Sequence, residues 1–309
     1  MNKYFYLPGY YAHSVFLHKL IQYKETHPNY FYKDRIIAGA YDLPYGLIWN
    51  GGRGSSEDYA IRPYNDKWVN SVMNDWYKVP NVILLHTCTN FFIDTKERLE
   101  DRNCNLFIQK YYRPQDKIII ANPTLKQYLK DTYPQVSFVN STTLGITNIE
   151  EVNKLSENEI YVINYNKNDD NKYLEQLKYK DNLEILCGEH CVKNCSNRHN
   201  HYSDISKMQL GIMKEYDVER RCPFFEKFKG VPLRELIENS AHRVPNWRLE
   251  ELSQMGYSHF KIAGRQWEPL DWLEVIVYYL VKPVYCQIVY RELGEWYQNT
   301  FTSVNLNLR

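Results

Sequence analysis

The chain has 309 residues, of which 44% are hydrophobic and 24% are charged, and its net charge is +1. This balance is that of an ordinary folded protein, and a net charge so close to zero excludes attraction of nucleic acid by overall charge alone. The N-terminus has no basic run followed by an apolar stretch, so we expect no signal peptide. No stretch approaches the ~18 consecutive apolar residues of a membrane span. We therefore expect a cytoplasmic protein without membrane insertion.

Short β-branched or apolar runs recur along the chain, and amphipathic stretches separate them. The expected strands are Tyr4–Leu7, Arg35–Ala40, Asn81–Leu85, Lys117–Ala121, Val136–Val139, Ile160–Ile163, Leu183–Leu186 and His259–Ile262. The expected helices are Ser14–Glu25, Asn65–Val79, Asn105–Tyr112, Thr124–Tyr133, Ile149–Lys154, Tyr173–Lys178 and one that begins at Pro269. Strands that alternate with helices indicate parallel βαβ units, and eight of them fit a (β/α)₈ TIM-type barrel. An open doubly wound sheet is the alternative.

The barrel is expected to occupy residues 1–283, with two departures from its regular pattern. Residues 187–246 form an unusually long cysteine-bearing loop between strands seven and eight. A connection this long in a compact domain is usually functional. Residues 284–309 are expected to form a helical extension packed on the outside of the barrel.

Polar residues follow the expected strands, at the end where barrel enzymes keep their chemistry. The candidate substrate-binding residues are Asn90, Asn122, Thr143, Asn164, Glu189 and, on a Gly-Gly loop, Arg53. Such a set is typical of a pocket for a polar ligand. The alternative for each residue is that it only caps its strand.

The seven cysteines are not expected to form disulfides in a reducing compartment, and their clustering favours metal binding. Candidate ligands are Cys187, Cys191, Cys195 and Cys222, with Cys104 as a substitute for Cys187. Thiolates on one loop can hold a zinc ion or an iron–sulfur cluster. The Cys222-Pro223 pair favours the cluster, whereas substitution of a thiolate by His190, His199 or His201 would favour zinc.

The spacing Cys187-x₃-Cys191-x₃-Cys195 is also close to the Cys-x₃-Cys-x₂-Cys motif of radical S-adenosylmethionine enzymes. It differs from that motif by one residue. It also follows the seventh expected strand, whereas those enzymes carry their motif after the first. This interpretation is therefore the weaker one.

Two segments together resemble a known family. The order Glu189-x-Cys191-x₃-Cys195-x₂-Arg198, followed by Cys222 and by the Phe-Lys-Ile-Ala-Gly-Arg stretch that ends at Arg265, resembles the collagenase-like peptidase family U32. The resemblance covers roughly residues 180–270, and the N-terminal half agrees only in architecture.

The resemblance implies a 4Fe–4S cluster held by four cysteines: Cys191, Cys195 and Cys222 match the family's ligands, and Cys187 is the fourth by proximity. It also implies, from several members of the family, oxygen-independent hydroxylation of RNA bases or of a quinone precursor. For this chain we expect a small polar or carboxylate-bearing substrate, with a nucleic-acid base as the alternative. The chain shows no Gly-x-Ser-x-Gly or His-Glu-x-x-His motif, so a peptidase is a weaker alternative. The other alternative is a non-catalytic protein in which zinc holds the long loop together and which binds a partner protein.

Three residues are candidate catalytic groups. Lys261 and Arg265 lie in the matched Gly-Arg stretch and could hold a carboxylate or phosphate. Arg265 could instead pair with a structural carboxylate such as Glu189. His201 is a candidate acid or base, with an exposed histidine as the alternative.

Overall fold

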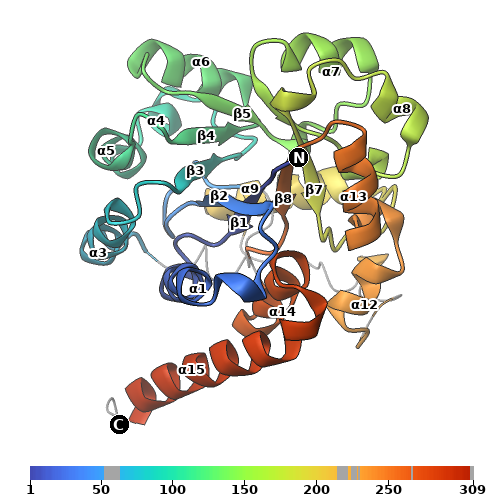
Figure 1. Ribbon diagram of the computed structural model, residues 1–309. Helices are drawn as coiled ribbons and strands as arrows, with labels where there is room; N and C mark the ends of the chain where they lie inside the picture. Colours follow the sequence, from blue (N-terminus) through green and yellow to red (C-terminus); the bar gives the residue numbers. More distant parts are fainter. Residues whose placement is uncertain (52–62, 214–221, 224–227, 229, 266, 307–309) are drawn as a thin grey trace.

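The computed structural model describes residues 1–51, 63–213, 222, 223, 228, 230–265 and 267–306, with the backbone alone for 301–306. Eight parallel strands close into a barrel in chain order (Figure 1). They are β1 (Lys3–Pro8), β2 (Arg35–Asp42), β3 (Ile83–Cys88), β4 (Lys117–Ile120), β5 (Phe138–Asn140), β6 (Ile160–Val162), β7 (Leu183–Cys187) and β8 (His259–Ile262). The barrel closes where Tyr6 of β1 pairs with Lys261 of β8. The predicted TIM-type barrel is thus confirmed, and the open sheet is excluded.

Helices surround the barrel and connect its strands (Figure 1). Those before β7 are α1 (Ser14–Thr26), α3 (Asp66–Tyr77), α4 (Lys96–Leu99), α5 (Arg102–Tyr111), α6 (Pro123–Thr132), α7 (Ile149–Ser156) and α8 (Asn171–Glu175). Those after β7 are α9 (Arg198–Gln209), α12 (Leu233–Glu238), α13 (Asn246–Gln254), α14 (Pro269–Leu280) and α15 (Cys286–Leu306). Short 3₁₀ turns are η1 (Pro28–Tyr30), η2 (Thr142–Leu144), η3 (Tyr165–Lys167), η4 (Lys180–Asn182), η5 (Ala241–Arg243) and η6 (Pro283–Tyr285).

Side-chain caps explain where several helices begin. The residue before the helix accepts a hydrogen bond from a backbone N–H of the first turn, which would otherwise have no partner. Asn65 caps α3, Asp101 caps α5, Asn122 caps α6, Asn148 caps α7 and Asp170 caps α8. Each such cap stabilises its helix by about 1 kcal/mol.

The strands bury side chains on both faces, which gives two apolar layers. The lumen of the barrel contains Tyr6, Tyr41, Leu85, Ile119, Val139, Val162 and Leu186. A larger layer fills the space between the barrel and its helices, and it includes Phe5, Trp76, Ile185 and Trp272. Because side chains alternate along a strand, Leu186 faces the lumen while its neighbours Ile185 and Cys187 face the helices.

The segment between β7 and β8 is not a plain loop, because it contains α9, α12 and α13. The N-terminal half of α9 contacts the loop after β3, where Tyr202 packs edge-on against Phe91. The expected outer helix at the C-terminus is present as α15, which packs on α14 and extends away from the barrel (Figure 1). In the described part of the chain no helix combines the length and apolar character needed to cross a membrane.

Candidate functional site

A cavity lies at the carboxyl end of the barrel strands. The space in it that a water-sized molecule can occupy is about 90 Å³. Its walls come from β2, β3, β4, β5, β7 and β8 or the residues that follow them, and from α9. Thr143, Glu189, Lys261 and Arg265, all predicted as site residues, line it. The barrel therefore brings together residues far apart in sequence at the end where this fold binds substrates.

Lys261 projects into the lumen and lines the cavity, although only 6% of its surface is exposed. Its Nζ lies 4.2 Å from the ring centroid of Tyr41, a cation–π contact. Loss of hydration lowers the pKa of Lys261 to about 8, although the charge of Glu184 opposes this shift. Burial likewise raises the pKa of Glu184. Burial therefore favours the uncharged form of both the Glu184 acid and the Lys261 amine.

Arg265 is buried and already engaged. Its Nη1 donates to Oδ1 of Asn50 (3.0 Å) and its Nη2 to the carbonyl of Gly51 (2.6 Å). Oδ1 of Asp42 lies 3.6 Å from Nη1. Arg265 therefore ties the segment after β8 to the segment after β2, and its carboxylate partner is Asp42.

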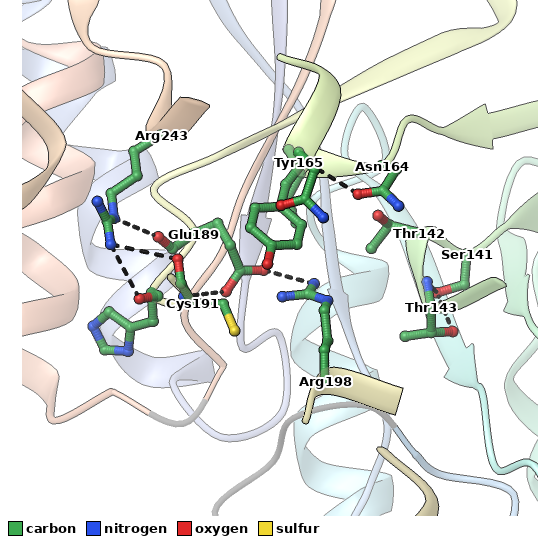
Figure 2. Close-up of polar contacts among 12 residues, drawn as sticks. Ser141, Thr142, Thr143, Asn164, Tyr165, Glu189, Cys191, Arg198 and Arg243 are labelled. Atoms are coloured by element: carbon green, nitrogen blue, oxygen red, sulfur yellow. Dashed lines mark hydrogen bonds and ion pairs between the residues drawn. The ribbon is translucent and has the colours of Figure 1, made fainter. Parts of the chain in front are cut away.

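Glu189 and Arg198 form a buried ion pair at the cavity wall, which Figure 2 shows in close-up. Nη2 of Arg198 donates to Oε2 of Glu189 (2.9 Å), and the backbone N–H of Cys191 donates to Oε1 (3.0 Å). The guanidinium also lies 4.1 Å from the ring centroid of Tyr165 and 5.0 Å from that of Tyr202. Both oxygens of Glu189 are thus used to fix α9 and Cys191.

Arg243 holds the same segment from its other side (Figure 2). Its Nε donates to the carbonyl of Glu189 (2.9 Å), and its Nη2 contacts the carbonyls of His190 and Cys191 at 3.4 Å each. Trp267 adds a further bond, from its Nε1 to Nδ1 of His190 (3.1 Å). Arg243 therefore fixes the backbone of residues 189–191, and Trp267 fixes the ring of His190.

Three of the predicted ligands gather around this segment. Cys191 is buried, whereas Cys195 and Cys222 are half-buried. Burial raises the pKa of the Cys195 thiol, and charge on Cys191 and on Cys222 raises it further, so all three thiols lie near one another. Arg198 and Arg243 both interact electrostatically with Cys191. Cationic neighbours favour thiolates, which is the form that binds metals.

The structure does not bring Cys187 or Cys104 to these three thiols. Cys187 faces the helices, where its thiol and Tyr279 of α14 interact, and burial raises its pKa. Cys104 is 1% exposed on α5 and lies near Asp101 and Cys88. Both candidates for the fourth ligand are therefore on the helix side of the barrel wall.

The donor set fits a sulfur-bound metal group in its chemistry, because thiols suit iron–sulfur or zinc. Among the described residues, however, no group of three or more His, Cys, Asp or Glu is arranged to hold a metal ion. The connection from Cys195 to Cys222 includes residues 214–221, which lie outside the described ones. Metal sites often form only when the metal binds, so a ready-made arrangement is not required.

Three predicted substrate-binding asparagines have local structural roles. Asn90 donates to the carbonyls of Ile48 (2.9 Å) and Ser206 (3.1 Å). Asn122 caps α6, and Asn164 caps η3. None of the three is among the residues that line the cavity. Their amides close loops and helix ends, as the capping alternative proposes.

The two remaining candidates lie elsewhere. His201 lies in the first turn of α9, half-buried, and its ring stacks on Tyr202 at 6.5 Å between centroids. It is not among the residues of the cavity wall. Arg53 falls outside the described residues.

Several residues of the site were not singled out from the sequence. They are Tyr41, Thr87, Thr89, Glu184, Arg243 and Trp267. One local signal was available for Glu184, because an acidic residue interrupts the apolar run of β7. Nothing local distinguishes Arg243, which reaches the site only through the fold.

Gly264 shapes the cavity wall by leaving room for Trp267. Its φ is +124°, and a Cβ at this position would lie 2.3 Å from a ring carbon of Trp267. We expect Gly264→Ala to cost about 1–3 kcal/mol in overpacking beyond the cost of the backbone conformation. Urea unfolding measures the loss.

Gly145→Ala is the matched control, because Gly145 also has a positive φ (+71°) but no atom within 4 Å of the added Cβ. Its expected cost is the conformational one alone, about 1–2 kcal/mol. Equal losses of stability in the two variants would contradict the predicted clash with Trp267.

Comparison with known proteins does not assign the chain to a family. It matches no family model, no curated protein and no solved structure.

Proposed function

We propose that the protein is an iron–sulfur enzyme that modifies a small, carboxylate-bearing substrate in the cavity at the carboxyl end of its barrel. One observation carries the proposal: the segment that supplies Glu189 and Arg198 to the cavity wall also contains Cys191 and Cys195. A group bound by these thiols would therefore lie beside the substrate. The resemblance of this segment to the U32 family makes oxygen-independent hydroxylation the reaction class that we propose.

The residues of the chain have distinct proposed roles. Cys191, Cys195 and Cys222 hold the cluster, which would exchange electrons with the substrate when bound. Arg198 provides positive charge in the cavity, which favours a carboxylate over a neutral nucleic-acid base, and Lys261 provides an amine. Arg243 keeps the cysteine segment in place through its carbonyls. Free thiols of this kind persist in a reducing cytoplasm, where we place the protein.

Metal analysis after anaerobic purification tests the proposal. We expect stoichiometric iron and a broad visible absorption band in the unaltered protein. Replacing Cys191, Cys195 or Cys222 by serine should remove most of the iron, because an iron–sulfur cluster prefers thiolate ligands to hydroxyl ligands. Cys286→Ser is the matched control, since Cys286 is also half-buried but lies at the start of α15.

The alternatives give different results. Colourless protein with one zinc per chain would overturn the proposal in favour of a zinc-stapled binding protein. Hydrolysis of casein that vanishes in Arg265→Ala would favour a peptidase. Cys187→Ala should keep its iron, because the thiol of Cys187 faces the helices.

A further inference from the structure

Lys261 has an unusual environment for a lysine. Its Nζ forms no hydrogen bond within 3.5 Å and no ion pair within 4.0 Å with any described residue. The nearby carboxylate of Glu184 is 1% exposed, and within the described ranges neither of its oxygens has a hydrogen-bond partner. A lysine used only to stabilise a fold is normally paired or hydrated. Lys261 is paired with none of the described residues, and it faces a cavity.

Part of the cavity wall is apolar. Tyr41, Ile119, Leu186 and Ala263 line the cavity together with Lys261. The Tyr41 hydroxyl donates to the carbonyl of Ile262 (2.7 Å) and is therefore occupied. A lysine desolvated in an apolar pocket is activated as a nucleophile, because it more readily loses its proton.

The cavity also contains unused hydrogen-bond donors for an anion. Nη1 of Arg198 is buried and has no hydrogen-bond partner within the described ranges, although Nη2 holds Glu189. The hydroxyls of Thr87 and Thr89 are likewise buried, with no partner among the described residues. These three side chains line the same cavity as Lys261. A bound carboxylate would satisfy them.

We propose that Lys261 is a carbonyl-reactive amine and that the cavity binds a small 2-oxo acid, whose keto carbon reacts at Nζ and whose carboxylate binds Nη1 of Arg198. This inference rests on the proposed carboxylate-binding cavity and names its substrate class. It does not require the iron–sulfur cluster.

The reaction is a condensation without electron transfer. The neutral amine attacks the keto carbon, so a C–N bond forms while the carbonyl π bond opens. The oxygen gains the proton that the nitrogen loses, which gives a carbinolamine. This species expels water and leaves an imine. The pKa of about 8 for Lys261, set mainly by burial, provides neutral amine in mildly alkaline solution.

Reductive trapping tests the proposal. The purified protein is incubated with pyruvate and cyanoborohydride, and its peptides are analysed by mass spectrometry. We expect near-stoichiometric addition of one reduced pyruvyl group at Lys261 and only trace addition at exposed lysines. Lys261→Arg should abolish this label, since a guanidinium forms no stable imine. Lys178→Arg, at an exposed lysine, should leave it unchanged.

A second measurement tests the acid-binding half. Acetone has the same keto carbon but no carboxylate, so it should label Lys261 far less than pyruvate does. Arg198→Met should remove this preference for pyruvate. If that variant does not fold, the ratio of pyruvate label to acetone label in the unaltered protein is the test. Absence of label at Lys261 would overturn the proposal, even if the lysine binds anions by charge alone. Equal labelling by the two ketones would overturn the 2-oxo acid.

The iron content of the same preparation tests the proposed cluster independently of the labelling of Lys261. Iron with no label at Lys261 would overturn the reactive lysine and leave the cluster standing. Label without iron would support the lysine and overturn the cluster.

Discussion

Replacing Asp116 by alanine is expected to destabilise the protein by about 3–5 kcal/mol, the cost of leaving a buried charge without its partner. Asp116 is fully buried and accepts from Nε (2.9 Å) and Nη2 (2.8 Å) of Arg113. It also accepts from the backbone N–H of Leu84 (2.8 Å). The variant would leave the buried guanidinium of Arg113 without its carboxylate and the N–H of Leu84 without a partner. Urea unfolding at neutral pH measures the loss.

Asp94→Ala is the matched control for this variant. Asp94 pairs with Arg98 at 2.8 Å, but the Asp94 side chain is 58% exposed, so we expect a loss below about 1 kcal/mol. Similar losses in Asp94→Ala and Asp116→Ala would contradict the role of burial. Asp116 immediately precedes β4, so the pair lies at the amino end of the strands, where this fold keeps residues needed for stability.

The stability that Asp116 contributes should depend on pH. Burial alone would raise the pKa of Asp116. The nearby imidazole of His86, whose Nε2 lies 3.7 Å from Oδ2, and the hydrogen bonds from Arg113 outweigh burial and lower the pKa below its usual value. A carboxyl with a lowered pKa stabilises the folded state above its unfolded pKa of about 3.9. The difference between Asp116→Ala and the unaltered protein should thus be constant near neutrality and shrink as the pH falls through the lowered pKa.

Replacing Glu189 by alanine is expected to weaken iron binding by about 10–100-fold, the usual effect of losing a group that orients metal ligands. Glu189 is 4% exposed, and it connects Arg198 to the backbone N–H of Cys191. Without it, Arg198 keeps a buried charge with no carboxylate, and the Cys191 segment loses one of its fixed contacts. Iron released to a chelator, measured against chelator concentration, gives the change in affinity.

Asp169→Ala is the matched control for this effect. Asp169 binds Lys193 of the same cysteine segment at 2.6 Å, but at the surface. Its loss should leave iron binding nearly unchanged, because an exposed ion pair holds its partners weakly. If Glu189→Ala retains iron as firmly as Asp169→Ala, the buried pair does not position the thiols.

The strands of the barrel could be predicted because their signal is local. The run Leu183–Leu186 predicts β7 almost to its ends, and Pro269 marks the start of α14. Helix caps such as Asp170 also act within one turn. The helix α9 could not be predicted in this way. Its sequence is polar, with only Tyr202, Ile205 and Ser206 buried, so it shows no apolar periodicity.

The cysteines show a second limit of sequence reasoning. A strand in a closed parallel barrel is buried on both faces, so its residues do not alternate between apolar and polar. The sequence therefore cannot tell that Leu186 faces the lumen and Cys187 the helices. For the same reason, proximity in sequence placed Cys187 with Cys191, whereas the barrel wall separates their side chains.

The sequence by itself determined the order of the strands, the barrel they form, and the placement of Glu189 and Lys261 near strand ends. It did so because these features depend on residues within a few positions of one another. Only the tertiary structure decided which polar groups have hydrogen-bond or ion-pair partners within the protein and which face the cavity without one. Arg265 is paired with Asp42 and Asn50, whereas Lys261 and Nη1 of Arg198 lack hydrogen-bond partners among the described residues. That distinction arises from contacts between segments that meet only when the barrel closes.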